Sequence, residues 1–451
     1  MNHFLRYLST IAFALLLLIV PGFTYAQTGS EDTELILSLE EAIGLAMEQN
    51  HTLEQAQYEV DKNKAKFRQT RAVFLPQLSL EYNAVSTNDP LNVFGFKLKQ
   101  EVVTQEDFNP DILNDPGSYE NYSASIEVRQ PLINPDMFFQ RGAARSNMLS
   151  SEEQLNGTKN RIRYQVSNHY YKLILNTGQV DVLETALKTA AEHRRQAENL
   201  FGEGMLSKED YLAARVYELE MESRLMNTGN QLEDTQEEMA LMLGLDDSRK
   251  IIAADTLDEV EDAISVADIT RRGIDNAALR AIDQRVQAAE SMVRSAQLRF
   301  LPTINAFGSY EYHDPDFGGF GASSYMVGIN LRWNLFSGFR QAGKIQEARA
   351  DFNRAQSVKA QYTKEMSNRV RRASRSLDHA RKELELAEQS IISAEEDVTI
   401  RSNRYQEGLE RTTDLLEAET RLAEARLKQI MARYQYRISI AMLEMLLEEE
   451  F

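Results

Sequence analysis

The sequence predicts a mainly helical protein with a membrane β-barrel, built from long antiparallel coiled-coil helices and four strands per chain in two tandem structural repeats. Three observations predict it. A similar order of segments occurs twice, four segments alternate apolar and polar residues, and the stretches between them have coiled-coil spacing. The composition agrees, because the chain is rich in Ala, Glu, Leu and Arg and has only 9 Pro in 451 residues.

The first 26 residues are expected to be a secretory signal peptide. Arg6 precedes an apolar run at 11–20, and Thr24-Tyr25-Ala26 offers a cleavage site of the usual kind. The alternative, a membrane anchor, is disfavoured because the run is shorter than a spanning helix requires. The chain has no Cys, so we expect neither disulfides nor a lipid-bearing cysteine in the exported protein.

The repeat is clearest in two helical segments. LFGEGMLSKEDYLAARVYELEMESRL at 200–225 matches RYQEGLERTTDLLEAETRLAEARL at 404–427, with Gly204 on Gly408 and Asp210 on Asp414, 204 positions apart. VRQPLINPD at 128–136 matches LRWNLFSGF at 331–339, but the two Phe-Leu-Pro segments, at 74 and 300, lie 226 apart. The first repeat therefore carries an insertion of about 22 residues between its strands, and we expect two copies of one unit.

The expected boundaries follow from this alignment. The first repeat covers 27–247, with a β-hairpin at 74–134 and a helical tip at 201–210. An equatorial linker covers 248–262. The second repeat covers 263–451, with a hairpin at 300–337 and a tip at 405–414. In each repeat an opening helix, near 39–72 or 266–299, should end where Pro76 or Pro302 removes a backbone donor.

The four strands are expected to have one apolar and one polar side. On the first, Leu78, Leu80 and Tyr82 alternate with Ser79 and Glu81. A soluble antiparallel sheet can alternate in the same way, but a length of about ten residues with aromatics near the ends is typical of membrane barrel strands. Four strands cannot close such a barrel. Subunits would share an eight-stranded barrel as a dimer or a twelve-stranded one as a trimer, and a wide lumen favours the trimer.

The long helices carry a heptad seam. From Val370 to Tyr405 the apolar positions advance by alternating steps of three and four residues, and many of them are Ala. A helix over 137–201 would be roughly 97 Å long at the rise of an α-helix. The shorter helices at 39–72 and 207–243, stacked end to end, would match it. The helices therefore predict a long shaft.

These motifs together resemble the TolC-like outer membrane efflux protein family (outer membrane factors). The segments that carry the resemblance occur in pairs and in order: FLPQLSLEY and FLPTINAFG, RQPLINPD and RWNLFSGF, GEGMLSKEDYLAA and QEGLERTTDLLEA. The resemblance implies a homotrimer with a twelve-stranded barrel in the outer membrane lipid and an α-helical tunnel through the periplasm. It also implies a passive exit duct of a tripartite efflux or type I secretion system, which docks a periplasmic adaptor (membrane fusion) protein and an inner-membrane pump.

The resemblance also assigns roles to residues at the two tips. The positions that would dock the adaptor are Gly204, Leu206, Ser207, Gly408, Leu409 and Thr412. Those that would form the gate and selectivity ring are Asp210, Tyr405, Asp414 and Glu417. Three copies of each acid would favour cations, although an ordinary solvated acidic face and a plain core tyrosine are the alternatives. Glu410 stands where the family commonly has a basic residue, which departs from the family's gate ion pair.

Other function classes find little support. The six His do not pair at ligand spacing, and no nucleophile constellation is apparent, so no enzyme activity, metal or cofactor is expected. A net charge of −19 argues against nucleic acid as a partner. A non-conducting envelope coiled-coil scaffold is the alternative function, and it would not need strands with a lipid-facing side. Substrate choice should lie with the pump, so small-molecule and protein ducts both stay open. The long first loop, about 85–122, should lie outside the cell.

Overall fold

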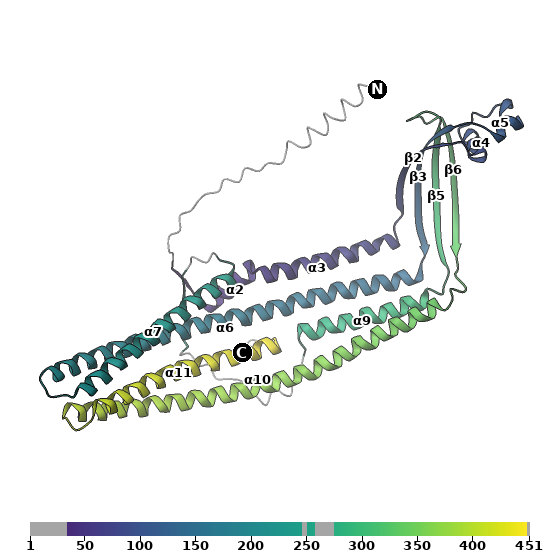
Figure 1. Cartoon of the computed structure of the whole chain (residues 1–451). Helices are drawn as coiled ribbons and strands as arrows, with labels where there is room; N and C mark the ends of the chain where they lie inside the picture. Colours follow the sequence, from purple (N-terminus) through teal and green to yellow (C-terminus); the bar gives the residue numbers. More distant parts are fainter. Residues whose placement is uncertain (1–33, 246–249, 258–274, 449–451) are drawn as a thin grey trace, which may run out of the picture.

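The computed structural model describes residues 34–245, 250–257 and 275–448. The predicted signal peptide lies outside the described residues, as do parts of the predicted linker and of the second opening helix. A long shaft of helices ends in a four-stranded sheet, which stands at an angle to the shaft (Figure 1). The predicted combination of long helices and four strands in tandem repeats is confirmed.

The shaft contains two very long helices, α6 (Pro135–Gly202, 68 residues) and α10 (Arg340–Gln406, 67 residues). Each turns back at a tip into a shorter helix, α7 (Lys208–Leu243) or α11 (Thr412–Leu447). The part of the shaft nearer the sheet is completed by α2 (Leu39–Gln49), α3 (His51–Gln69) and α9 (Ala277–Leu298). In the described part of the chain, no helix combines the length and the apolarity that crossing a membrane requires.

The predicted heptad seam of α10 packs against α11. Val370, Leu377 and Leu384 are at most 7% exposed and form one cluster with Tyr436 and Leu443 of α11. Alanines at the intervening seam positions are also buried, which lets the two helix backbones approach closely. The spacing seen in the sequence therefore corresponds to a real helix–helix contact.

The opening helix of the first repeat differs from its prediction, because it is divided at Asn50 instead of running unbroken over 39–72. The Asn50 side chain accepts a hydrogen bond from the Thr52 amide at 2.9 Å, and its Nδ2 donates to the Met242 carbonyl at 2.9 Å. Asn50 therefore ends α2 and caps α3 while it fastens both to α7. The last turn before Pro76 is a 3-10 helix, η1 (Thr70–Val73).

A small parallel sheet lies part-way along the shaft, where β1 (Leu35–Leu37) pairs with β4 (Ile251–Ala253). Packed against it, a core of Tyr170, Met239 and Leu243 joins α6 to α7, and each of these side chains is no more than 1% exposed. The Tyr170 hydroxyl lies 2.8 Å from Asp255 Oδ2, which accepts a hydrogen bond from the Leu39 amide at the start of α2.

The larger sheet is antiparallel in the order β2-β3-β5-β6. Its strands are β2 (Gln77–Thr87), β3 (Tyr119–Ile133), β5 (Thr303–Asp314) and β6 (Ala322–Arg332). The register aligns one apolar row across all four strands, Leu80, Ile126, Tyr310 and Tyr325, and an adjacent row that is mainly polar, Ser79, Glu127, Ser309 and Met326. We call the two sides the apolar face and the polar face. The predicted two-sided strands are confirmed.

The insertion between β2 and β3 has structure of its own. It contains α4 (Pro90–Lys99), the 3-10 helix η2 (Gln105–Phe108) and the short α5 (Pro110–Asn114). These elements gather at the end of the sheet that is remote from the shaft (Figure 1).

Candidate functional site

The two tips have the same backbone turn. After α6, Gly204 has φ +73°, and after α10, Gly408 has φ +72°. In each turn the glycine amide donates to the carbonyl three residues back, and the next amide donates to the carbonyl five residues back, Leu200 or Arg404. This is the Schellman arrangement, which needs a left-handed residue that glycine adopts without strain. The repeat predicted from sequence therefore extends to individual hydrogen bonds.

The first turns of the two helices that follow, α7 and α11, are stabilised by different contacts. Ser207 caps α7: its Oγ accepts from the Asp210 amide at 3.1 Å and donates to the Asp210 carboxylate at 2.6 Å. The equivalent residue before α11 is Arg411, whose Nε and Nη2 donate to the two carboxylate oxygens of Asp414, both at 2.9 Å. A neutral cap in the first repeat is replaced by a bidentate ion pair in the second.

Glu410, which departs from the family pattern, is held within its own tip. Arg401 Nη1 lies 2.9 Å from one of its carboxylate oxygens and Arg404 Nε lies 2.9 Å from the other. The Glu410 side chain is only 12% exposed. Both arginines lie on the last turns of α10, so this contact ties the tip loop back onto the helix that precedes it. We call these three residues the Glu410 clamp.

The clamp continues into a longer chain of charges. Arg401 also donates to Asp397 at 2.8 Å, and Asp397 accepts from Arg421 of α11 at 2.8 Å. Arg421 in turn lies 3.8 Å from Glu417, whose side chain is 69% exposed. Hydrogen bonds from Arg421 and Arg401 hold the pKa of Asp397 below its usual value. These contacts cross between α10 and α11 and join the two helices beside the tip.

Asp414 and Glu417, the predicted selectivity acids, therefore lie among arginines of the same chain. The hydrogen bonds from Arg411 hold the pKa of Asp414 below its ordinary value, and the same pairing raises the pKa of Arg411. Asp414 is thus ionised at neutral pH, but its charge is largely offset by its partner. Glu417 has the more exposed carboxylate of the two.

The other predicted positions are distributed over the two turns. The Tyr405 hydroxyl accepts a 3.4 Å hydrogen bond from Thr412, which is 4% exposed, so these two join the end of α10 to the start of α11. Leu409 is 64% exposed at the end of its turn, whereas Leu206 is half-buried in the first. The first tip has an aromatic stack, Phe201 on Tyr211 at 5.7 Å, where the second has Tyr405.

The partners of these acids were not predicted from the sequence. Arg401, Arg404, Arg411 and Arg421 were assigned no role, although together they balance the acids of the second tip. The sequence does contain one indication of this pairing, because Arg401 occupies a position of the otherwise apolar heptad seam. A charged residue in such a seam generally has a partner of opposite charge.

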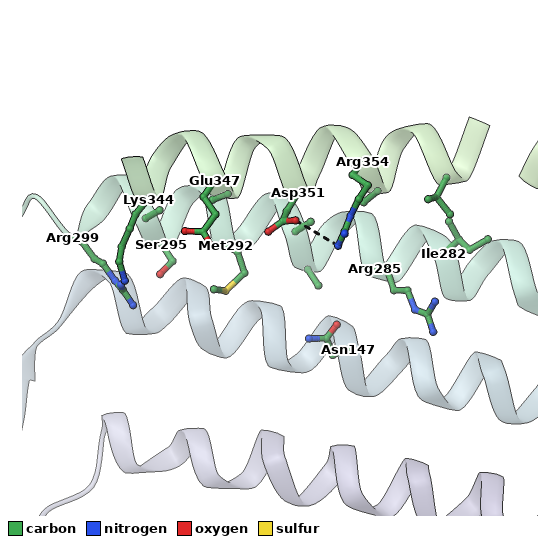
Figure 2. Close-up of a pocket in the computed structure, with 16 residues that line it drawn as sticks. Asn147, Ile282, Arg285, Met292, Ser295, Arg299, Lys344, Glu347, Asp351 and Arg354 are labelled. Atoms are coloured by element: carbon green, nitrogen blue, oxygen red, sulfur yellow. Dashed lines mark ion pairs between the residues drawn. The ribbon is translucent and has the colours of Figure 1, made fainter. Parts of the chain in front are cut away.

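A separate groove of about 840 Å³ runs between α9 and α10 near the sheet. Figure 2 shows charged side chains of both helices along it, including Arg285 of α9 and Lys344 and Glu347 of α10. The ion pair of Asp351 with Arg354, at 3.5 Å, lies within α10. Much of the remaining lining is alanine. Among the described residues, no group of three or more His, Cys, Asp or Glu could hold a metal ion.

Comparison with known proteins identifies the family. The family model described as outer membrane efflux protein matches residues 42–245 and 274–448. Outer membrane protein TolC of Vibrio cholerae is 21% identical over 335 residues, which is 71% of this chain and 75% of that protein.

Solved structures share the fold. A membrane protein from Pseudomonas aeruginosa matches with a TM-score of 0.78 at 17% identity, over 95% of this chain and 99% of that one. The CmeC outer membrane channel of Campylobacter jejuni matches with a TM-score of 0.78 at 16% identity, over 95% and 93%. The chain therefore belongs to the outer membrane efflux protein family, and it is a TolC-like outer membrane protein whose helical shaft extends into the periplasm.

Proposed function

We propose that this protein is a passive, trimeric exit duct of a tripartite efflux or type I secretion system. It would receive substrates from a periplasmic adaptor and an inner-membrane pump and release them outside the cell. The observation that carries the proposal is the joining of a two-faced, four-stranded sheet to a helical shaft of roughly 100 Å. Such a sheet has one side suited to lipid and one suited to water.

The apolar face supports a membrane position for the sheet. Leu80 is 76% exposed and Val327 is 77% exposed, although both are large apolar residues. A soluble monomer rarely leaves so extended an apolar surface uncovered. Lipid would cover it, while the opposite polar face, which includes Glu127 and Ser309, would line a water-filled lumen.

Closure by three copies is supported by the open edges and by the internal repeat. β2 and β6 each have one edge with no strand partner in this chain's four-stranded sheet, so β6 of one copy can pair with β2 of the next. In the shaft, α9 of the second repeat packs along α6 of the first. The equivalent neighbour of α10 would be α3 of a second copy. Three copies would close twelve strands and one ring of helices.

The tips are proposed as the adaptor-docking and gating end. The exposed Leu409 and the two glycine turns offer the docking surface, together with Leu206, Ser207 and Thr412. Asp210, Tyr405, Asp414 and Glu417 would surround the narrow end of the tunnel. Because Asp414 is paired with Arg411, the proposed cation preference rests mainly on Glu417. The latch at this gate would be the Glu410 clamp within each chain.

The test is single-channel conductance of the detergent-purified oligomer in a planar bilayer. Small, cation-preferring steps are expected from a duct that rests nearly closed. Leu80→Arg should prevent insertion, because an arginine on the lipid side costs roughly 2–4 kcal/mol near the middle of the bilayer. Ser79→Arg, one residue away on the polar face, is the matched control and should still insert. A protein that never forms a conducting oligomer would support the envelope scaffold instead.

A further inference from the structure

The insertion between β2 and β3 packs onto the polar face of the sheet. Lys99, the last residue of α4, lies 3.7 Å from Glu311, which belongs to the polar face of β5. The next residue, Gln100, donates through Nε2 to Asn121 Oδ1 at 3.0 Å, and Asn121 belongs to the polar face of β3. The chain thus turns inward over the sheet instead of extending beyond its end.

Gln100 is the main anchor of this arrangement. It is 5% exposed, and its side chain makes three hydrogen bonds, with Asn121, with the Glu120 carbonyl and with the Tyr119 hydroxyl. Next to it His313 of β5, 4% exposed, lies 3.3 Å from Asn121 and 3.3 Å from Glu311. This buried polar cluster joins the insertion to two strands at the end of the sheet that is remote from the shaft (Figure 1).

The insertion is also packed and internally bonded. Val93 of α4 is 2% exposed, and α4 lies against β6, whose first residue, Ala322, is 3% exposed. Lys97 pairs with Asp107 of η2 at 2.5 Å, and Asp107 also accepts from the Thr104 amide at 2.7 Å. These bonds hold the pKa of Asp107 down to about 2, so the pair stays ionised far below neutral pH. A segment fastened in this way has a defined position.

We propose that α4 and the turns that follow it form a cap inside the outer mouth of the duct. The inference rests on the proposed function, because only in a closed barrel does the polar face become the lumen wall. A helix that lies on this face, at the end remote from the shaft, then occupies the exit. Three copies of the helix narrow the exit of the duct. The exposed Leu91 and Leu98 make part of the helix surface that does not touch the sheet apolar. Large molecules pass only when the cap moves.

The experiment uses an engineered cysteine, because the chain has none of its own. Ser79→Cys places a thiol on the polar face at the shaft end of β2, distant from the insertion. Intact cells are exposed to a small charged maleimide or to a large polyethylene-glycol maleimide, both added outside. The labelling rates are compared for the natural insertion and for a variant in which 90–117 is replaced by a short Gly-Ser linker.

The cap predicts that the small reagent labels both forms, whereas the large reagent labels only the form without the insertion. Gln100→Ala, which removes the side-chain hydrogen bonds to Asn121, Tyr119 and the Glu120 carbonyl, should raise labelling by the large reagent about tenfold. Gln105→Ala, an exposed glutamine of the same insertion, is the matched control and should leave it unchanged.

The outcomes separate the cap from the duct. If the large reagent labels both forms equally, or is excluded from both while the small one enters, the cap is overturned and the duct stands. If neither reagent labels the thiol even without the insertion, the polar face does not line a path to the exterior. In that case the proposed duct and the cap both fail.

Discussion

Arg411 and Asp414 form a bidentate ion pair, with both contacts at 2.9 Å, at the position where the first repeat has Ser207 hydrogen-bonded to Asp210. The backbone turns that precede the two pairs share the same glycine hydrogen bonds, from Gly204 or Gly408 and from the residue that follows it. The two repeats therefore share a backbone geometry but differ in the side-chain interaction that stabilises the start of the following helix. Ionic contacts are screened by salt and respond to pH, whereas the serine cap does so far less.

The first prediction concerns ion selectivity. Arg411→Ser should release the Asp414 carboxylate while it supplies a serine cap of the kind that the first repeat already uses. Cation preference should increase, because an uncompensated negative charge is added in each chain. The measurement is the reversal potential of single channels in a salt gradient. Arg411→Ser with Asp414→Asn is the control and should return to the original preference. An unchanged reversal potential in the single variant would place Asp414 away from the ion path.

The second prediction concerns acid. Because Arg411 lowers the pKa of Asp414 in the folded state, the pair stabilises the second tip at every pH above the ordinary carboxyl range, about 4. That contribution should be lost only as the pH falls through the lower folded value. Hydrogen exchange of peptides that cover 405–416 should therefore show a loss of protection below about pH 4. The Asp414→Asn variant should lack this transition, and a transition near neutral pH would contradict the assignment.

The third prediction concerns the Glu410 clamp. Glu410→Gln should loosen the second tip, because the neutral amide cannot pair with both Arg401 and Arg404. The fraction of time spent in larger conductance states should rise by about tenfold. Glu407→Gln is the matched control, since Glu407 is exposed in the same turn. If both variants behave like the parent protein, the clamp does not limit opening.

The fourth prediction concerns the tip glycines. Gly408→Ala should destabilise the folded turn by about 1–2 kcal/mol, because alanine is strained at a φ of +72°. No atom lies within 4 Å of the added methyl group, so a steric clash contributes nothing. Gly202→Ala, inside the last turn of α6, should be neutral or slightly stabilising. Export should fall in Gly408→Ala and in Gly204→Ala, with the oligomer still folded. Full export in both would move adaptor docking elsewhere.

The fifth prediction concerns the shaft. Tyr170→Phe should lower the free energy of unfolding by about 1–2 kcal/mol, since it leaves the buried groups around Asp255 without the hydroxyl. Burial raises the pKa of Tyr170, which favours the protonated hydroxyl that these hydrogen bonds need. Tyr58→Phe removes an exposed tyrosine hydroxyl on α3 and should change stability much less. Equal effects of the two changes would contradict the structural role of Tyr170.

Much of the architecture could be predicted from the sequence, because it depends on local periodicity. Alternation at Leu78, Leu80 and Tyr82 specifies a two-sided strand wherever that strand pairs. The step pattern through Val370 and Leu377 specifies which side of α10 is buried. The tip glycines and Pro76 act through their own backbone conformations, so their positions can be read without knowledge of any partner.

The remaining features depend on which distant segments meet, and only the tertiary structure decides that. Asn50 divides the opening helix because the Met242 carbonyl of α7 is within reach. Glu410 finds Arg401 and Arg404 only after the tip has turned. Gln100 is buried because α4 folds back onto Asn121. Each is a polar contact at about 3 Å whose energy depends on the geometry of the two groups that meet. The groups are far apart in the chain or are brought together by a turn, and sequence periodicity carries no information about such distances.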